Sequence, residues 1–239
     1  GPQGPAERVG AMLLGASPRV LLAAVGLAGT AAKVKDCQVS LEEALTPDVF
    51  AEEYMEQEPV VLRGAARRWS SARAWDAGAF VERYGATDVS LRDPERIKDE
   101  STFAPVVSTM PLAEYVKTMA TQRLPVFENR HTPLANAVRS SLNASGLALG
   151  RIRLKPIVSL GGERTGIGFH RHEQNWIGQL RGRKLWLLAP MEAERPRLQD
   201  ACSYAVKAAP SSLVKRCILR QGDALYLPGG WWHATCNLD

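Results

Sequence analysis

The sequence contains few histidines and cysteines and no long hydrophobic run. Only four of the 239 residues are histidine, four are cysteine, and aromatic residues make up 7%. The apolar run at residues 20–28 is much shorter than the roughly 20 residues needed for a transmembrane helix. The cysteines lack the paired spacing of zinc-binding modules, so a zinc-finger framework is excluded.

Composition and charge indicate one ordinary globular domain. A hydrophobic fraction of 45% and a charged fraction of 23% are typical of soluble proteins, and the length suits one sizeable domain. The net charge of +5 suggests an acidic partner, but the basic residues are scattered. Arg151, Arg153 and Lys155 alternate as they would along a strand, and no basic helix with interleaved aromatics is present. Nucleic-acid binding is therefore not expected.

The first 36 residues are typical of an N-terminal extension with a signal peptide. Arg19 precedes the apolar run, and small residues at 29–32 separate that run from a charged segment. This order matches a secretory signal and its cleavage site, and no stable membrane span is expected after cleavage. A hydrophobic N-terminal helix or anchor is the alternative.

The four cysteines are compatible with two states. In an oxidising compartment one pair can bond, and three pairings exist if all four cysteines are used. Buried free thiols are the other option. Asn143 begins an Asn-Ala-Ser glycosylation sequon, which matters only if the chain enters the secretory pathway.

Helices are expected mainly in the first half of the chain. Ser40 and Glu43 have capping-box spacing, and Thr46 precedes a proline, which together predict short helices across 40–57. Apolar spacing predicts helices at 75–84 and 111–119, the second with Pro111 in its first position. Short apolar runs predict strands at 59–64 and 89–91.

The second half has the pattern of an all-β fold. Glycine and proline turns separate short strand-like runs at 126–127, 157–160, 167–172, 185–188, 217–219 and 224–227. Many short strands at such spacing favour a sandwich or a barrel. Residues 191–213 carry prolines and charges and are expected to form an insert between strands.

Three of the four histidines fall into two segments that suit one metal ion. In a strand over 167–172, His170 and His172 would point to the same face, whereas Glu173 would not. A turn, a strand and a Pro-Gly-Gly turn then lead to His233. Two histidines at this spacing are by themselves more often structural, but the second segment makes the set specific. The pattern predicts a metal site, with His131 left outside it.

The residues around these histidines resemble the JmjC family of cupin-fold proteins. The resemblance rests on 166–172, 182–190 and 219–238, with supporting likeness at 59–64 and 111–119. It implies a mainly β fold with N-terminal helices, a double-stranded β-helix or jelly-roll barrel spanning 37–239. Family members continue into a further strand, so the C-terminal strand is expected to be truncated here.

The resemblance also implies roles for individual residues. His170 and His233 match the two histidine ligands of Fe(II), and His172 stands where active members usually have a carboxylate. Lys184 matches the lysine that pairs with the distal carboxylate of 2-oxoglutarate. Polar residues expected to contact the cosubstrate or line its pocket are Asn237, Thr165 and Asn175.

The resulting expectation is a 2-oxoglutarate- and Fe(II)-dependent oxygenase that hydroxylates a protein side chain. One alternative is an inactive pseudo-oxygenase that serves as a binding or scaffold module. The other is a three-histidine cupin dioxygenase that works without 2-oxoglutarate, against which Lys184 argues. The likeness extends to a luminal member of the family, which implies an address in the endoplasmic reticulum lumen. A protein substrate or partner is expected.

Overall fold

The computed structural model describes six segments of the chain, and every structural statement below concerns them: 35–69, 76–94, 104–129, 132–139, 157–197 and 200–239. The expected signal peptide, the sequon at Asn143 and the three alternating basic residues at 151–155 lie outside the described residues, as does His131. Within the described segments, the structure contains no helix that is both long and apolar enough to span a membrane.

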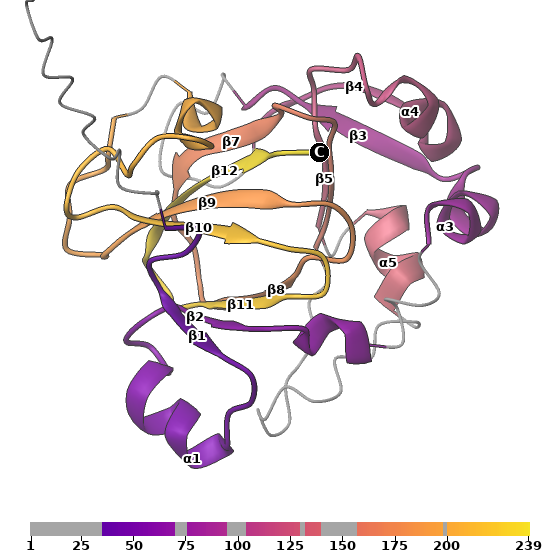
Figure 1. The fold of residues 1–239 in the computed structure, drawn as a ribbon. Coiled ribbons are helices and arrows are strands. Elements are labelled where there is room, and N and C mark those ends of the chain that lie inside the picture. The colour runs from indigo at the N-terminus through magenta and orange to yellow at the C-terminus, as the bar shows by residue number, and fades with distance from the viewer. Residues whose placement is uncertain (1–34, 70–75, 95–103, 130–131, 140–156, 198–199) are drawn as a thin grey trace, which may run out of the picture. The chain divides into compact units, whose positions relative to one another are not determined.

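Two four-stranded sheets form the barrel (Figure 1). The first has the order β1-β2-β11-β8, in which β1 and β2 are parallel and the other pairs are antiparallel. The second has the order β10-β9-β12-β7 and is antiparallel throughout. The strands of the first sheet are β1 (Ser40–Glu42), β2 (Val60–Leu62), β11 (Ala224–Leu227) and β8 (Asn175–Gly178). Those of the second are β10 (Lys215–Leu219), β9 (Lys184–Ala189), β12 (Trp232–Asn237) and β7 (Gly166–His170).

Apolar side chains from both sheets fill the space between them. The cluster draws on β2 and β11 of the first sheet and on β9 and β10 of the second, and contains Val61, Leu225, Leu227, Leu188, Leu219 and Trp186. Each of these side chains is at least 92% buried. This shared core makes the two sheets one double-layered unit, and the predicted jelly-roll barrel is confirmed.

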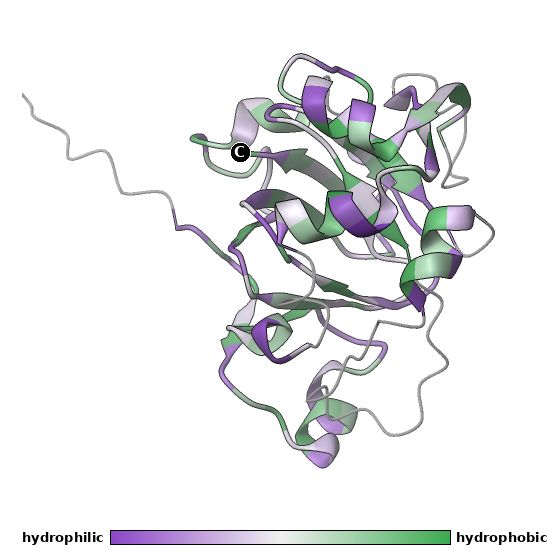
Figure 2. Cartoon of the chain, turned by 90° about the vertical axis from the view of Figure 1, so that its right-hand side faces the viewer, coloured by the Kyte–Doolittle hydropathy of each residue, from purple (hydrophilic) through white to green (hydrophobic). Residues whose placement is uncertain are grey.

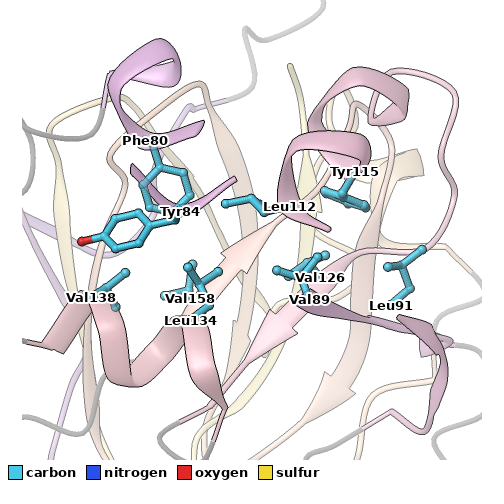
Figure 3. Packing of buried hydrophobic residues seen from close by; sticks show 10 residues of the cluster. All are labelled: Phe80, Tyr84, Val89, Leu91, Leu112, Tyr115, Val126, Leu134, Val138 and Val158. Atoms are coloured by element: carbon cyan, nitrogen blue, oxygen red, sulfur yellow. The ribbon is translucent and has the colours of Figure 1, made fainter. Parts of the chain in front are cut away.

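A third sheet and three helices pack beside the barrel. Its strand order is β4-β3-β5-β6, with bounds Val106–Pro111, Asp88–Arg92, Val126–Glu128 and Val158–Leu160. The helices are α3 (Ala77–Tyr84), α4 (Leu112–Thr118) and α5 (Pro133–Arg139). Figure 3 shows their apolar side chains meeting those of the sheet, including Tyr84, Leu112 and Leu134. In Figure 2 the helices carry hydrophilic and hydrophobic stretches, as expected for elements with one buried face.

The N-terminal segment departs in part from the sequence prediction. Thr46 caps α1 (Pro47–Val49), because its hydroxyl accepts a hydrogen bond from the Val49 N–H at 3.3 Å, and a short π-helical segment (Phe50–Tyr54) follows. The predicted helix at Ser40 is wrong. That segment is β1, since pairing with β2 satisfies its backbone, and tertiary pairing overrides the local capping pattern.

Other predicted elements are close to the observed ones. The predicted strands at 59–64 and 89–91 are confirmed as β2 and β3. Helix α4 begins at Leu112, so Pro111 is its N-cap and not its first residue. Strand β4 and helix α5 were not predicted, and a 3-10 helix, η2 (Ala65–Arg68), follows β2.

Two disulfides and a buried arginine hold the periphery to the barrel. Cys37 is bonded to Cys217 of β10, and Cys202, in the 3-10 helix η4 (Ala201–Tyr204) of the insert, is bonded to Cys236 of β12. The Arg216 side chain, 2% exposed, donates to the carbonyl oxygens of Tyr204, Ala205 and Lys35. The insert between β9 and β10 is therefore fixed to the second sheet at two points.

Candidate metal centre

Three imidazoles meet on the inner face of the barrel. His170 is the last residue of β7 and lies opposite His233 of β12, and their ring centroids are 4.1 Å apart. The ring of His172 lies 4.6 Å from that of His233. One nitrogen from each histidine lies within 4.8 Å of the others. The described residues contribute no carboxylate to this group, and Glu173 is exposed outside it.

The route by which His172 reaches the site differs from the prediction. Strand β7 ends at His170, so a continuous strand over 167–172 is wrong. Beyond His170 the chain leaves the second sheet and enters β8 of the first. The carbonyl oxygen of His172 accepts a hydrogen bond from the Gly230 N–H at 2.9 Å. Gly230 has a φ of +78°, a conformation that favours glycine, so the turn before β12 positions His172.

Backbone carbonyl groups set the tautomer of all three rings. Each Nδ1 lies within hydrogen-bond distance of a carbonyl oxygen: His170 with Gly168 at 2.8 Å, His172 with Glu173 at 2.6 Å and His233 with Trp231 at 3.0 Å. A carbonyl oxygen only accepts, so each Nδ1 carries the proton and each Nε2 keeps a free lone pair. Three Nε2 lone pairs are therefore available to one metal ion.

Burial keeps the two innermost rings neutral. It lowers the pKa of His170 to about 4, and electrostatic interactions with His172 and Arg195 add to this effect, whereas a hydrogen bond to Gly168 raises the pKa. Burial also lowers the pKa of His233 well below its ordinary value, with smaller contributions from His170 and His172. Neutral imidazole is the form that binds metal, so at pH 7 these ligands need lose no proton.

Lys184 lies on the same inner face as His233. The β9–β12 register places Lys184 opposite Asn237, Trp186 opposite Thr235 and Leu188 opposite His233. Since side chains alternate along a strand, Lys184 and His233 share a face and are two pleats apart. The Lys184 ammonium lies 3.5 Å from the Ser159 hydroxyl and makes no ion pair with any described residue. Although the residue is partly exposed, burial lowers its pKa to about 8.

Thr165 and Asn237 are bonded to each other. The Asn237 side-chain amide donates to the Thr165 hydroxyl at 2.9 Å, and its backbone N–H donates to the Thr165 carbonyl at 2.8 Å. A Cβ on Gly161 would lie 2.3 Å from the hydroxyl oxygen of Thr165, so only glycine permits this packing. The structure therefore places two of the three polar residues predicted near the cosubstrate, Thr165 and Asn237, at the Lys184 end of the barrel.

Asn175 and Trp186 each carry a buried polar side-chain atom that has no hydrogen-bond partner. Asn175 begins β8, opposite Leu227 of β11, and its side-chain oxygen is buried without a hydrogen bond. The Trp186 ring stacks on His233 with centroids 5.8 Å apart, and its Nε1 is also unpartnered. The structure thus places Trp186 between the histidines and Lys184 on the inner face.

Sequence reasoning missed two residues near the site. Ser159 contacts Lys184 from β6, and only the pairing of the third sheet brings it there. Arg195 lies in the insert, close enough to His170 to lower its pKa, and it follows Ala193, whose carbonyl accepts from Trp232 Nε1 at 2.9 Å. Neither position has a local sequence signal, since both depend on long-range packing.

The donor set and its surroundings fit the groups that the sequence implies. Three imidazoles suit iron, zinc, nickel or copper better than magnesium or calcium, which prefer oxygen ligands. A desolvated ammonium without an acidic partner fits the distal carboxylate of a dicarboxylate. Two sheets with three converging imidazoles on their inner face define a cupin-type barrel with a candidate metal centre.

A profile of the cupin-like domain family matches residues 46–238, and the chain belongs to the cupin-like family of JmjC proteins. The chain is 26% identical to human JmjC domain-containing protein 8 over 229 residues, which cover 88% of this chain and 83% of the relative. It is also 26% identical to the lysine-specific demethylase JMJ21 of Arabidopsis thaliana, over 80% of this chain but 23% of that protein. The predicted family is confirmed.

A solved structure supports the fold alone. The X-ray structure of E. coli ycfD aligns with a TM-score of 0.51 at 18% identity, covering 86% of this chain and 52% of that chain. This likeness agrees with the arrangement of sheets and carries no statement about activity.

Proposed function

We propose that the chain is an Fe(II)- and 2-oxoglutarate-dependent oxygenase that acts on a protein side chain. The observation that carries this proposal is that three converging imidazoles share an inner face with a lysine ammonium that has no acidic partner among the described residues. His233 and Lys184 lie on neighbouring strands and are separated by four residue steps, or about 13 Å along the strand direction. A dicarboxylate that joins the two groups would lie over Thr235 and Trp186.

Different residues of the chain would bind the metal, orient its ligands and bind the cosubstrate. His170, His172 and His233 would hold the metal through Nε2, with the backbone carbonyls fixing the ring directions. Lys184 would neutralise the distal carboxylate, and Asn237 with Thr165 would shape that end of the pocket. When bound, Fe(II) supplies the redox chemistry and the open positions for O₂ and cosubstrate.

His172 favours a second candidate, a pseudo-oxygenase that retains the fold as a binding module. A histidine in place of a carboxylate makes the ligand set one charge unit more positive, which changes metal affinity and redox properties. The three-histidine dioxygenase without 2-oxoglutarate is the third candidate, and it leaves the desolvated Lys184 without a role.

A protein substrate and a secretory location are parts of the same proposal. Two relatives carry names that describe them as demethylases, specific for lysine and for arginine respectively, which supports a polypeptide side chain as the substrate class. Two disulfides support an oxidising compartment, which agrees with the signal-like residues near the N-terminus. The endoplasmic reticulum lumen is the proposed address.

Metal and cosubstrate binding, measured separately, test the function. We expect about one iron per chain after anaerobic loading, and 2-oxoglutarate binding in equilibrium dialysis that depends on this iron. Lys184→Met should retain iron and lose 2-oxoglutarate, whereas His170→Ala should lose both. Lys215→Met is the matched control, since Lys215 pairs with Glu58 on the outside of β10.

Each result selects one candidate. A chain without iron affinity would contradict both enzyme functions. Iron without 2-oxoglutarate binding favours the three-histidine dioxygenase. Binding of both without oxygen-dependent consumption of 2-oxoglutarate, with or without a peptide substrate, favours the pseudo-oxygenase.

The pH dependence of 2-oxoglutarate binding should report the Lys184 ammonium. Its pKa is lowered to about 8, so the free protein carries this charge below that pH and loses it above. Affinity should be level between pH 6.5 and 7.5 and then fall, by up to about tenfold per pH unit above 8. Lys184→Arg remains charged throughout this range, so its profile should be flatter. Superimposable profiles of the two proteins would contradict this assignment.

A further inference from the structure

Three arginines line a hollow on the outside of the barrel, away from the histidines. The hollow has a volume of about 440 Å³ and is lined by Arg63, Arg67 and Arg220 together with Gly64, Gln221 and Asp223. It lies beside the start of β11, whose other end leads into the turn that contacts His172. From Asp223, which lines the hollow, to Leu227 at the other end of β11 there are four residue steps, or about 13 Å along the strand.

Asp223 anchors one side of the hollow. Its side chain is 6% exposed and forms an ion pair with Arg63. The same carboxylate accepts hydrogen bonds from the backbone N–H groups of Gly64, at 3.2 Å, and Arg220, at 2.9 Å. These bonds fix the Arg63 guanidinium and the loop that carries Arg220. They also use the only acidic group among the lining residues.

Arg220 and Arg67 are each held in place by a contact with a neighbouring residue. Arg220 pairs with Asp36, next to the Cys37–Cys217 disulfide. The Arg67 side chain crosses Gly222 so closely that a Cβ there would lie 2.5 Å from its Cγ and 2.6 Å from its Nε. Gly222 has a φ of +93°, so both its conformation and its missing side chain suit this contact.

The charges of the hollow are unbalanced. Arg63 pairs with Asp223 and Arg220 pairs with Asp36, whereas the Arg67 guanidinium has no hydrogen bond or ion pair with the described residues. Guanidinium groups bind phosphate and sulfate through paired N–H donors, and several arginines at one place are typical of such sites. An oxyanion would offset the positive charge of Arg67 and would accept hydrogen bonds from its guanidinium, whose donors no described residue uses.

We propose that this hollow is a second ligand site, which binds the phosphate or sulfate group of a small ligand or of a modified side chain. Arg67 provides the free guanidinium, Arg63 and Arg220 provide the flanking positive charge, and Asp223 holds the framework. The site is independent of the metal centre and does not require that the chain be an enzyme.

Inorganic phosphate and O-phosphoserine are suitable probes, with binding measured by calorimetry at constant ionic strength in a buffer free of both. Arg67→Gln should weaken the binding of each probe by at least about tenfold, the effect expected for the loss of a charge-assisted contact. Arg68→Gln is the matched control. Arg68 is the next residue of the same 3-10 helix, is exposed, and does not line the hollow.

Lys184→Met separates this site from the metal centre, because Lys184 is the other place where an anion is expected to bind. Phosphate affinity should be unchanged in that variant. Tighter binding of O-phosphoserine than of phosphate would indicate a modified side chain as the natural source, and equal binding would indicate a free ion. The proposal is wrong if neither probe binds, or if Arg68→Gln weakens binding as much as Arg67→Gln.

Discussion

Replacing His233 with alanine is expected to lower the affinity of the chain for a divalent transition metal by at least about a hundredfold. Structural zinc sites with four ligands bind with about 10–16 kcal/mol, or roughly 2.5 to 4 kcal/mol for each ligand. Losing one such ligand therefore corresponds to about a hundred- to a thousandfold. Of the three histidines His233 is the most buried, and its ring contacts both of the others.

The same measurement on two further variants separates ligation from folding. His172→Ala changes a half-buried residue outside the strands, so it should retain the fold while lowering metal affinity in the same way. His131→Ala removes the fourth histidine, which the sequence prediction leaves out of the metal site, and should leave affinity unchanged. Titration with Zn²⁺ or Fe²⁺ against a competing chelator provides the constants. Equal affinities in all three variants would show that the cluster does not hold the ion.

Removal of the Cys37–Cys217 disulfide is expected to cost about 5 kcal/mol in the free energy of unfolding. The bond joins residues 180 positions apart, and closing so long a loop restricts the unfolded chain strongly. It is also the covalent link that holds the segment before β1 to β10. Because many domains are stable by only 5–15 kcal/mol, the Cys37→Ala/Cys217→Ala variant should be marginally folded.

The second disulfide provides an internal comparison. Cys202 and Cys236 are 34 positions apart, so chain entropy predicts a smaller loss of about 4 kcal/mol for the corresponding double variant. Urea unfolding of the oxidised wild type and of both double variants measures the difference. A larger loss from the shorter loop would show that contacts in the native insert, and not the unfolded chain, determine the stabilisation.

The barrel and the histidine cluster were predictable because they depend on patterns within the sequence. Short apolar runs separated by turns indicated the strands, and the motifs at 166–172 and 219–238 located two parts of one site. Lys184 was identified through the family resemblance, because its position alone does not distinguish it from an exposed lysine at a strand end. The predicted family and fold are confirmed.

What could not be predicted depends on contacts between distant segments. Ser40 has a helix-capping pattern but pairs as a strand with β2, because the barrel needs a partner at that edge. His172 lies beyond the end of β7 and is placed by Gly230, 58 residues later. The cysteine pairing required knowing that the insert folds back on β12, and no spacing rule contains that information.

The two faces of strand β12 contact different parts of the molecule. His233, Thr235 and Asn237 face the barrel interior, while Trp232 and Cys236, on the other face, hold the insert through a hydrogen bond to Ala193 and a disulfide. Strand β12 thus connects the candidate metal centre on one side with the insert on the other. A mutation in the insert that moves β12 would therefore also move His233, in addition to any change in the effect of Arg195 on His170. Divergence among relatives could therefore adjust the centre without altering any ligand.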